Sequence, residues 1–352
     1  MLNIDNLLQE AVVAQASDIH LTSGVSPIFR ISGVLTATQY PVLDDKDTEA
    51  MVMAITNTEQ KEKFQQLGEL DFSYAIAGLS RFRVNTFRQR GSSAMAIRVV
   101  TEQIPTLEQL GHREVVKVLA RKPRGLVLVT GPTGSGKSTT LAAMLDLINT
   151  ERACHILTLE DPIEYLHTHK KSIINQREIN TDTKSFANAL RAALREDPDV
   201  ILVGEMRDAE TIGIAITAAE TGHLVFATLH TSDAAQTIDR ILDVFPPYQQ
   251  QQVRTQLSST LQGIVAQQLL PRRDDSGRVA AIEVLMATPA VRNIIREGKT
   301  QQLLSVIQTG AKTGMQAMDM SLRDLYWKGI VTYEEALARA MDQETFVRLV
   351  NG

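Results

Sequence analysis

The residues at positions 131–138, Gly-Pro-Thr-Gly-Ser-Gly-Lys-Ser, have the types and spacing of a loop that binds phosphate. They fill the pattern G-x-x-x-x-G-K-[ST], in which glycines let successive backbone N–H groups turn toward phosphate oxygens. Lys137 can neutralise the β- and γ-phosphates of a nucleoside triphosphate, and the Ser138 hydroxyl can bind Mg²⁺. We therefore expect ATP and Mg²⁺ here, with these nucleotide-binding residues: Gly131, Thr133, Gly134, Ser135, Gly136, Lys137, Ser138 and Thr139.

Hydrolysis of a bound nucleotide also needs a base and an attacking water. Three carboxylates, Glu160, Asp161 and Glu164, follow the apolar residues at 155–159, and Pro162 forces the chain out of regular structure. Glu164 could orient and deprotonate the water, so we assign it a catalytic role beside Lys137. A solvated surface loop is the alternative interpretation of this acidic cluster.

A second apolar segment, Val-Ile-Leu-Val at 200–203, leads through Gly204 to Glu205. Glu205 is suited to holding Mg²⁺ through a water molecule, and we assign it to both the metal site and catalysis. The usual form of this motif ends in Asp-Glu. Gly204 stands where that Asp would be, so direct ligation by that residue is excluded.

Two histidines, His223 and His230, flank a third apolar segment at 224–228. Seven strand residues separate the two imidazoles by roughly 20 Å, too far to share a metal ion. His230 at the carboxyl end of the segment would face the nucleotide and could hydrogen-bond the γ-phosphate. His223 is expected to be structural.

The elements that must position these residues alternate between strand and helix from about residue 124 onward. Apolar runs at 125–129, 155–159, 200–203 and 224–228 predict strands, and the loop pattern requires a helix over 137–148. Residues 184–196 repeat apolar residues at helical spacing. The alternation predicts an α/β domain with a mainly parallel sheet covered on both faces. After Pro247 we predict helices, interrupted by a short strand at 279–285.

Residues 2–101 predict a small α+β domain, with an opening helix, a short strand at 26–31 and a polar helix over 47–67. Residues 72–101 contain five arginines and no acid: Arg81, Arg83, Arg88, Arg90 and Arg98. They form either a solvated strand face or a surface for phosphate oxygens. A connector at 101–111 and a helix at 113–120 follow, and we place the domain limit after residue 113. Nucleotide state is expected to change the angle between the domains about this connector.

Composition excludes several classes of protein. The 352 residues are 43% hydrophobic and 22% charged, as in globular chains of about two domains. The net charge is −5, and both halves are acidic, which argues against a nucleic-acid binder. The single cysteine, Cys154, cannot form an intrachain disulfide or a four-cysteine zinc site. We find neither a signal peptide nor a membrane-spanning apolar run, and expect a cytoplasmic protein without membrane insertion.

Together these motifs resemble the secretion ATPase superfamily of P-loop NTPases, and within it the motors that retract type IV pili. The matching segments are Ala-Ser-Asp-Ile-His-Leu at 16–21, the loop continued to Met144, Leu-Glu-Asp-Pro-Ile-Glu-Tyr at 159–165, Asp-Pro-Asp-Val-Ile-Leu-Val-Gly-Glu-Met-Arg-Asp at 197–208, Thr-Gly-His-Leu-Val-Phe-Ala-Thr-Leu-His-Thr at 221–231 and Ile-Arg-Glu-Gly-Lys-Thr-Gln-Gln-Leu at 295–303. The resemblance runs over nearly the whole chain.

The resemblance implies a PAS-like N-terminal domain at 1–113 and a RecA-like ATPase domain with helical C-terminal part at 114–352. It also implies a homo-hexamer with ATP between subunits, working on an inner-membrane platform protein (PilC-like) at the cytoplasmic face. Glu205 matches the family's Walker B glutamate and Glu164 its catalytic glutamate. Arg83 and Arg98 match arginines that contact nucleotide, and Arg81 does so less securely.

The branch follows from what this chain lacks: export and assembly relatives carry an extra N-terminal domain and a four-cysteine zinc insertion. A PilU-like accessory retraction ATPase is the alternative, and such a protein is also a candidate partner. Residues 291–298 vary from the commoner form of the C-terminal motif. A nucleic-acid translocase, a nucleotide-gated module without turnover and a small-molecule kinase are the rivals that share the phosphate loop.

Overall fold

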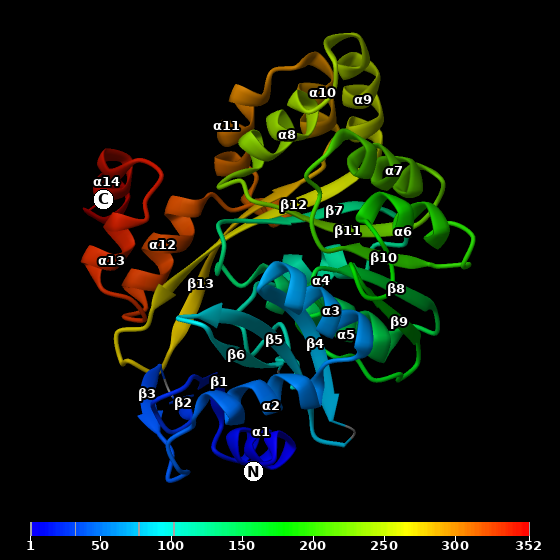
Figure 1. The fold of residues 1–352 in the computed structure, drawn as a ribbon. Coiled ribbons are helices and arrows are strands. Elements are labelled where there is room, and N and C mark those ends of the chain that lie inside the picture. Colours follow the sequence, from blue (N-terminus) through cyan, green and yellow to red (C-terminus); the bar gives the residue numbers. More distant parts are fainter. Residues whose placement is uncertain (1, 32, 77, 101–102, 352) are drawn as a thin grey trace. The chain divides into compact units, whose positions relative to one another are not determined.

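The computed structural model describes residues 2–31, 33–76, 78–100 and 103–351, which form two compact units (Figure 1). The first ends at Gln103 and also includes Glu164–Leu166. The second contains Ile104–Ile163 and the chain from His167 onward. The boundary between the units lies between Gln103 and Ile104. The predicted boundary after residue 113 instead assigned the connector to the first domain.

The first unit has the expected α+β architecture. Its six strands form one antiparallel sheet in the order β3 (Val34–Ala37), β2 (Ile28–Ile31), β1 (Ala16–Leu21), β6 (Ser92–Val100), β5 (Ser80–Gln89) and β4 (Glu69–Ile76). Helices α1 (Ile4–Val13), α2 (Asp45–Ile55) and α3 (Thr58–Leu67) share a hydrophobic core with one face of this sheet. Alternate strand residues such as Phe82 and Val84 enter that core.

The prediction of a single polar helix over 47–67 is wrong. The segment forms two helices, because Asn57 begins a new one: its side chain accepts a hydrogen bond from Gln60 N, and the Gln60 side chain accepts one from Asn57 N, each at 2.9 Å. This reciprocal pair is a capping box. Its Asn-x-x-Gln signature is present in the sequence.

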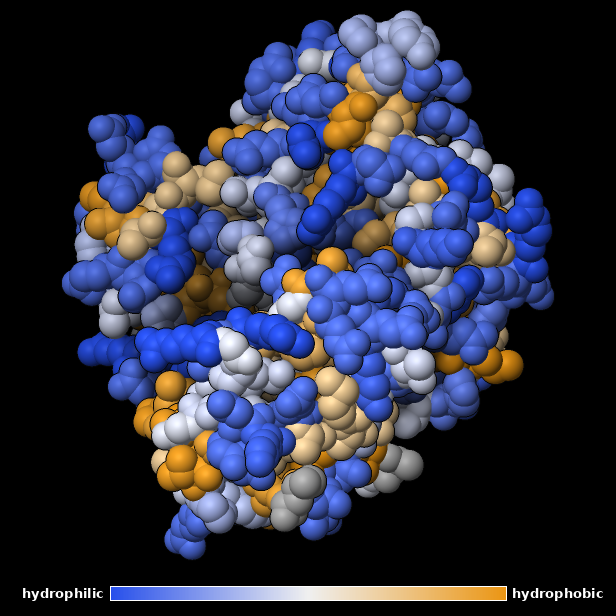
Figure 2. Space-filling model, viewed as in Figure 1, coloured by the Kyte–Doolittle hydropathy of each residue, from blue (hydrophilic) through white to orange (hydrophobic). Residues whose placement is uncertain are grey.

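Figure 2 shows a mostly hydrophilic visible face, with hydrophobic residues gathered over β3 at its lower left. Val34 and Leu35 of β3 are 66% and 52% exposed. β3 is the edge strand of its sheet, and an edge with exposed apolar side chains is open to pairing with another strand.

The second unit contains the predicted mainly parallel sheet. Its strand order is β13 (Arg278–Met286), β12 (Leu261–Pro271), β7 (Gly125–Thr130), β11 (Leu224–Leu229), β10 (Val200–Val203), β8 (His155–Glu160) and β9 (Ile173–Glu178). Every neighbouring pair is parallel except β12 and β13. The strands predicted at 125–129, 155–159, 200–203 and 224–228 are confirmed to within a residue at each end.

Helices cover both faces of this sheet. One face packs against α4 (Glu114–Ala120) and α5 (Lys137–Glu151). The other face packs against six helices: α6 (Phe186–Ala193), α7 (Ala209–Glu220), α8 (Ala234–Asp243), α9 (Pro247–Thr260), α10 (Pro289–Glu297) and α11 (Leu303–Thr309). Neighbouring residues of β7 face opposite cores, as a strand buried on both faces requires.

The prediction of helices between Pro247 and residue 279 is wrong for β12, which runs over Leu261–Pro271 beside β7. Leu261, Ile264 and Val265 have helical spacing, and α9 ends directly at Thr260 without a loop. Burial on both faces of the sheet explains why no alternation of apolar and polar residues marks this strand.

The chain ends in α12 (Met318–Trp327), α13 (Tyr333–Ala338) and α14 (Gln343–Asn351), which share a small core around Leu322 and Phe346. Short 3₁₀ turns at Thr300–Gln302 and Ala311–Thr313 flank α11. Within the described ranges, no helix combines the length and the apolar character needed to cross a membrane.

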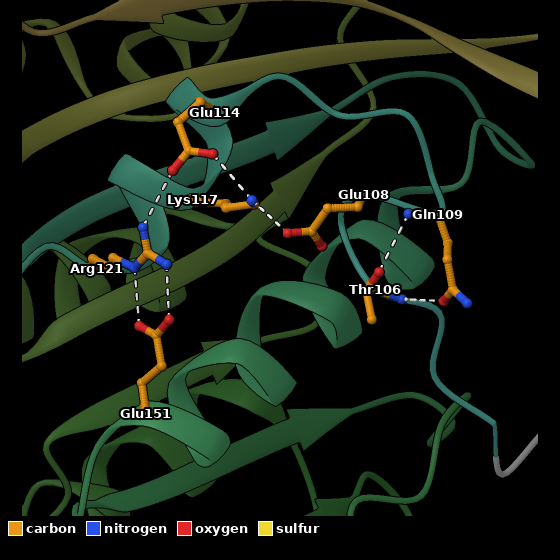
Figure 3. A network of polar contacts seen from close by, with 7 residues as sticks. All are labelled: Thr106, Glu108, Gln109, Glu114, Lys117, Arg121 and Glu151. Atoms are coloured by element: carbon orange, nitrogen blue, oxygen red, sulfur yellow. Dashed lines mark hydrogen bonds and ion pairs between the residues drawn. The ribbon is translucent and has the colours of Figure 1, made fainter.

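Much of the predicted connector is anchored to the second unit. Leu107 is buried in the core beside α4 and α5. Thr106 N donates to Gln109 Oε1 (2.8 Å), and Gln109 N donates to Thr106 Oγ1 (3.2 Å). Figure 3 shows Lys117 of α4 between Glu108 and Glu114. The chain from Ile104 to Gly111 is therefore fixed, and Thr101 and Glu102 of the predicted hinge lie outside the described residues.

Candidate nucleotide-binding site

The sheet of the second unit brings most of the predicted site residues to one edge. Strands β7, β11, β10 and β8 are parallel neighbours in that order, so their carboxyl ends lie side by side. The phosphate loop follows β7, His230 follows β11, Glu205 follows β10 and Glu160 ends β8. In such sheets, ligands bind at this edge.

The loop has the backbone conformation that its glycines predict. Gly131, Gly134 and Gly136 have φ angles of +143°, +77° and +87°, which side-chain-bearing residues rarely adopt. Lys137 is 9% exposed, and its Nζ donates to the carbonyl oxygens of Gly131 (2.8 Å) and Pro132 (3.0 Å). The ammonium group is therefore held across the loop, while Pro132–Gly134 are exposed to solvent.

The amino end of α5 lies at the loop. Gly136 occupies the N-cap position and has no side chain to cap the helix, unlike Asp208 before α7 and Asp233 before α8. The half-exposed Ser138 and Thr139 belong to the first turn. An uncapped helix start next to a glycine-rich loop favours an anion, because the helix dipole is positive there.

Glu205 lies close to an arginine, a histidine and the loop lysine. Arg207 Nη2 donates to Glu205 Oε2 at 2.7 Å, and His230 Nε2 lies 3.2 Å from Oε1. Burial raises the pKa of Glu205, but the hydrogen bond from Arg207 and the nearby charges outweigh burial and lower that pKa. Lys137 of the loop is among those charges. Glu205 is therefore ionised at neutral pH, as a carboxylate facing a hydrated Mg²⁺ should be. Arg207 lies in the segment at 197–208, but sequence reasoning gave it no role.

Gly204 is explained by close packing of β10 against β8. Its N–H donates to Leu159 O at 2.7 Å. A Cβ at position 204 would lie 3.0 Å from that same oxygen and 3.3 Å from the Cα of Glu160. A side chain at position 204 would therefore crowd the backbone of β8, and Glu205 is the carboxylate that this strand supplies.

The three acids after β8 have different surroundings. Glu160 accepts hydrogen bonds from Thr158 Oγ1 (2.6 Å) and Gln176 Nε2 (3.2 Å), whereas Asp161 is exposed. Glu164 is also exposed and belongs to the first compact unit, not to the unit that holds the loop. Its catalytic role stays a prediction.

His223 has the surroundings of a structural residue. It precedes β11, at the edge of the sheet opposite His230. Its Nδ1 lies 2.9 Å from Ala218 O and 3.3 Å from Thr221 Oγ1, so the ring bridges the turn between α7 and β11.

Arg81, Arg83 and Arg98 lie on the sheet face opposite the core of the first unit. Arg88 lies on the other face, with its guanidinium 5.7 Å from the centre of the Phe64 ring, and Arg90 follows the end of β5. Arg83 and Arg98 are exposed and directly opposite each other on β5 and β6. Arg98 Nε donates to Asp18 Oδ1 at 2.8 Å, and Arg30 is 3.9 Å from the other oxygen of Asp18. Exposure of Arg83 agrees with both interpretations of this face, and Arg98 is paired with Asp18, an acid to which the sequence analysis gave no role. Binding of nucleotide by Arg83 and Arg98 stays a prediction.

Another residue that sequence reasoning missed is Gln267 of β12, whose Nε2 donates to the Ser135 carbonyl of the loop at 2.7 Å. The strand itself was predicted as helix, so no pattern directed attention to this side chain. Among the described residues, no group of three or more His, Cys, Asp and Glu side chains could hold a metal ion.

The chain matches the family model described as "Type II/IV secretion system protein" over residues 1–338. The "Type IV pilus retractation ATPase PilT" of Pseudomonas aeruginosa is 50% identical, over 98% of this chain and all of the relative. The "Type IV pilus ATPase PilU" of the same organism is 43% identical, over 99% of this chain and 91% of the relative.

A solved structure described as the pilus retraction motor PilT with bound ADP superposes with a TM-score of 0.93. It is 50% identical in sequence, and the match covers 99% of this chain and 100% of that one. The similarity therefore includes both compact units.

Proposed function

The chain belongs to the type II/IV secretion system protein family, and from that premise we propose that it is a motor ATPase that drives retraction of type IV pili. The observation that carries this proposal is the full-length similarity to a retraction ATPase whose solved structure holds ADP. The loop, the uncapped start of α5 and Glu205 at the adjacent strand end supply the groups that such an activity needs.

In this proposal the loop holds the phosphates of ATP. Lys137 exchanges its present carbonyl partners for β- and γ-phosphate oxygens, and backbone N–H groups of the loop and of the first turn of α5 bind the same phosphates. Mg²⁺, when bound, neutralises phosphate charge. The Ser138 hydroxyl would ligate it, and the ionised Glu205 would hold it through water.

Glu164 serves as the base that activates water, and His230, next to Glu205, contacts the γ-phosphate. The subunits form a homo-hexamer, in which Arg83 and Arg98 contact nucleotide. Their cationic charge would stabilise the phosphates as the terminal bond breaks. Hydrolysis changes the angle between the two domains and thereby does mechanical work.

The ring works at the cytoplasmic face of the inner membrane, against a PilC-like platform protein. A PilU-like accessory role is the second candidate, favoured by 43% identity to PilU over almost the same length. The higher identity to PilT favours the primary motor.

Phosphate release from ATP by purified wild-type protein and by Lys137→Ala tests the enzyme. Wild type should release phosphate without any acceptor, and Lys137→Ala should lose at least about 100-fold of that rate, since charge stabilisation at a transferred phosphoryl group is worth several kcal/mol. Lys184→Ala removes an exposed lysine of the same unit and is the control. Equal turnover by wild type and Lys137→Ala would overturn the proposal.

Twitching motility in a Pseudomonas aeruginosa strain tests the cellular role. A primary motor restores twitching to a strain that lacks PilT. An accessory protein restores twitching only to a second strain, which keeps PilT and lacks PilU. Restoration in neither strain would contradict pilus retraction while leaving ATP hydrolysis intact.

A further inference from the structure

Beneath the phosphate loop, four buried residues form a continuous chain of hydrogen bonds. His112 Nε2 lies 2.9 Å from Thr140 Oγ1, and Thr140 Oγ1 lies 2.8 Å from Gln267 Oε1. Gln267 Nε2 then donates to Ser135 O at 2.7 Å. None of the four is more than 9% exposed. This relay joins three distant parts of the sequence: the end of the connector, the second turn of α5, and β12.

The direction of each hydrogen bond is fixed. Thr140 has one hydroxyl proton and donates it to Gln267 Oε1, so its contact with His112 requires a proton on Nε2. Burial lowers the pKa of His112 to about 4, so at pH 7 the ring is neutral and carries its single N–H proton at Nε2. The amide of Gln267 is oriented by an acceptor contact on one side and a donor contact on the other. Every donor in the relay therefore points toward the loop.

Gln267 also limits the loop sterically. A Cβ on Gly131 would lie 2.2 Å from the Gln267 carbonyl oxygen, and a Cβ on Gly136 would lie 2.7 Å from Gln267 Nε2. The backbone of Gln267 therefore excludes a side chain at position 131, and a side chain at position 136 would displace the Gln267 amide.

Anchoring the Ser135 carbonyl has a consequence for phosphate binding. In a trans peptide group the C=O and the following N–H point in opposite directions. Because Gln267 holds the carbonyl of Ser135 toward β12, the N–H of Gly136 in the same peptide group points away from β12. An N–H group held in this orientation is a preorganised donor for an anion on the other side of the loop.

We propose that Gln267 is a positioning residue for the phosphate loop, and that Thr140 and His112 hold its amide in the productive orientation. The proposal rests on the proposed nucleotide binding by the loop. It also links the loop to the connector, because the backbone N–H of His112 donates to Leu107 O at 2.9 Å.

The test compares Thr140→Val, which keeps the shape but removes the hydroxyl, with Thr140→Ser, which keeps the hydroxyl. Binding of a fluorescent ADP analogue and the KM and kcat for ATP are measured. Thr140→Val should weaken ADP binding and raise the KM about five- to tenfold, with kcat within about twofold, because one buried hydrogen bond is broken and its partners are left unsatisfied. Thr140→Ser should remain within about twofold of wild type.

Ser321→Ala is the matched control for stability. Ser321 Oγ accepts a hydrogen bond from Ile282 N at 3.0 Å, so this variant also loses one buried hydroxyl contact in the second unit, outside the relay. Its melting temperature should fall as that of Thr140→Val does, while its affinity for ADP stays at the wild-type value.

Unchanged ADP affinity in Thr140→Val, or an equal loss in Ser321→Ala, would overturn the positioning role. If Thr140→Val does not fold, His112→Gln, which keeps an N–H donor, and His112→Leu, which has none, repeat the comparison. Wild-type protein that binds no ADP would refute the proposed function itself, and the relay proposal with it.

Discussion

The Nε2 of His230 lies 3.2 Å from Oε1 of Glu205, at the ends of two adjacent parallel strands. This pair links a carboxylate suited to Mg²⁺ with a residue that can hydrogen-bond phosphate. The side chain of Glu205 is 21% exposed and that of His230 41%, so both remain reachable from solvent at the edge where nucleotide would bind.

Glu205→Gln should nearly abolish hydrolysis while leaving ADP bound. The substitution keeps the shape of the side chain but removes the negative charge that would hold hydrated Mg²⁺. We expect turnover to fall by about 100-fold or more, as when one electrostatic group of a reaction site is lost. Steady-state phosphate release and ADP affinity measure the two effects. Glu196→Gln removes an exposed carboxylate paired with Arg177 and should retain wild-type turnover. Similar losses in both variants would contradict a specific role for Glu205.

Gly204→Ala should destabilise the protein, because its Cβ would lie 3.0 Å from Leu159 O, a backbone atom that cannot easily move. We expect a loss of about 1–3 kcal/mol in the free energy of unfolding, as for other overpacked sites. Gly213→Ala is the matched control. Gly213 lies inside α7, and a Cβ there would contact only Phe245 Cε1, at 3.9 Å. Because alanine favours a helix more than glycine does, this variant should gain about 0.5–1 kcal/mol in the free energy of unfolding. Urea denaturation distinguishes the two signs.

The stability of the second unit should depend on the ionisation of Glu283 on β13. This buried carboxyl accepts a hydrogen bond from Ala234 N at 2.9 Å, at the start of α8. Burial raises its pKa to about 7, the N–H groups of Ala234 and Met318 oppose that rise, and Asp233 and Asp319 add to it.

The folded protein thus retains this proton to about pH 7, whereas the unfolded chain loses it near pH 4.5. The unfolded state binds fewer protons in this window, so Glu283 makes the protein less stable as pH rises from about 4.5 to about 7. Glu283→Gln keeps an acceptor oxygen and cannot ionise. It should match wild type at pH 4.5 and exceed it by up to about 3 kcal/mol at pH 8. Urea denaturation at pH 4.5 and at pH 8 measures the difference in stability between the two proteins. The same difference at both pH values would refute this prediction.

The ion pair between Arg121 and Glu151 should contribute little to stability. Two hydrogen bonds join the guanidinium to the carboxylate, at 2.9 and 2.8 Å, but Arg121 is 44% and Glu151 37% exposed (Figure 3). Glu151→Gln should cost less than about 1 kcal/mol at low salt, and the difference should disappear in 1 M NaCl. Melting curves at both salt concentrations measure it. A larger cost that persists in salt would mean that the pair organises α4 and α5.

The phosphate loop and the strands around it could be predicted because their signals are local. A fixed motif follows a short apolar run, and the carboxyl ends of parallel strands must meet at one edge. The same reasoning predicts that Glu205 and His230 lie near Lys137. It also gave a structural role to His223.

What sequence could not provide depends on contacts between distant segments. β12 is stabilised by pairing with β7, while its own residues have helical spacing, so Gln267 could not be placed below the loop. The pairing of Arg98 with Asp18 depends on the register of β1 and β6. The break at Asn57 is different, because its capping signature, Asn57 followed by Gln60, is a local signal present in the sequence.

Helix α5 contacts the segment that precedes β7 near both of its ends. Thr140 contacts His112 near the loop, and Glu151 pairs with Arg121 at the far end. At 1.5 Å per residue, its 15 residues make a rod of about 22 Å. Between these two contacts, apolar side chains of α4 and α5 pack in one core, so the two helices are expected to move together. The phosphate loop leads directly into α5, so a displacement of the loop would be passed to both helices.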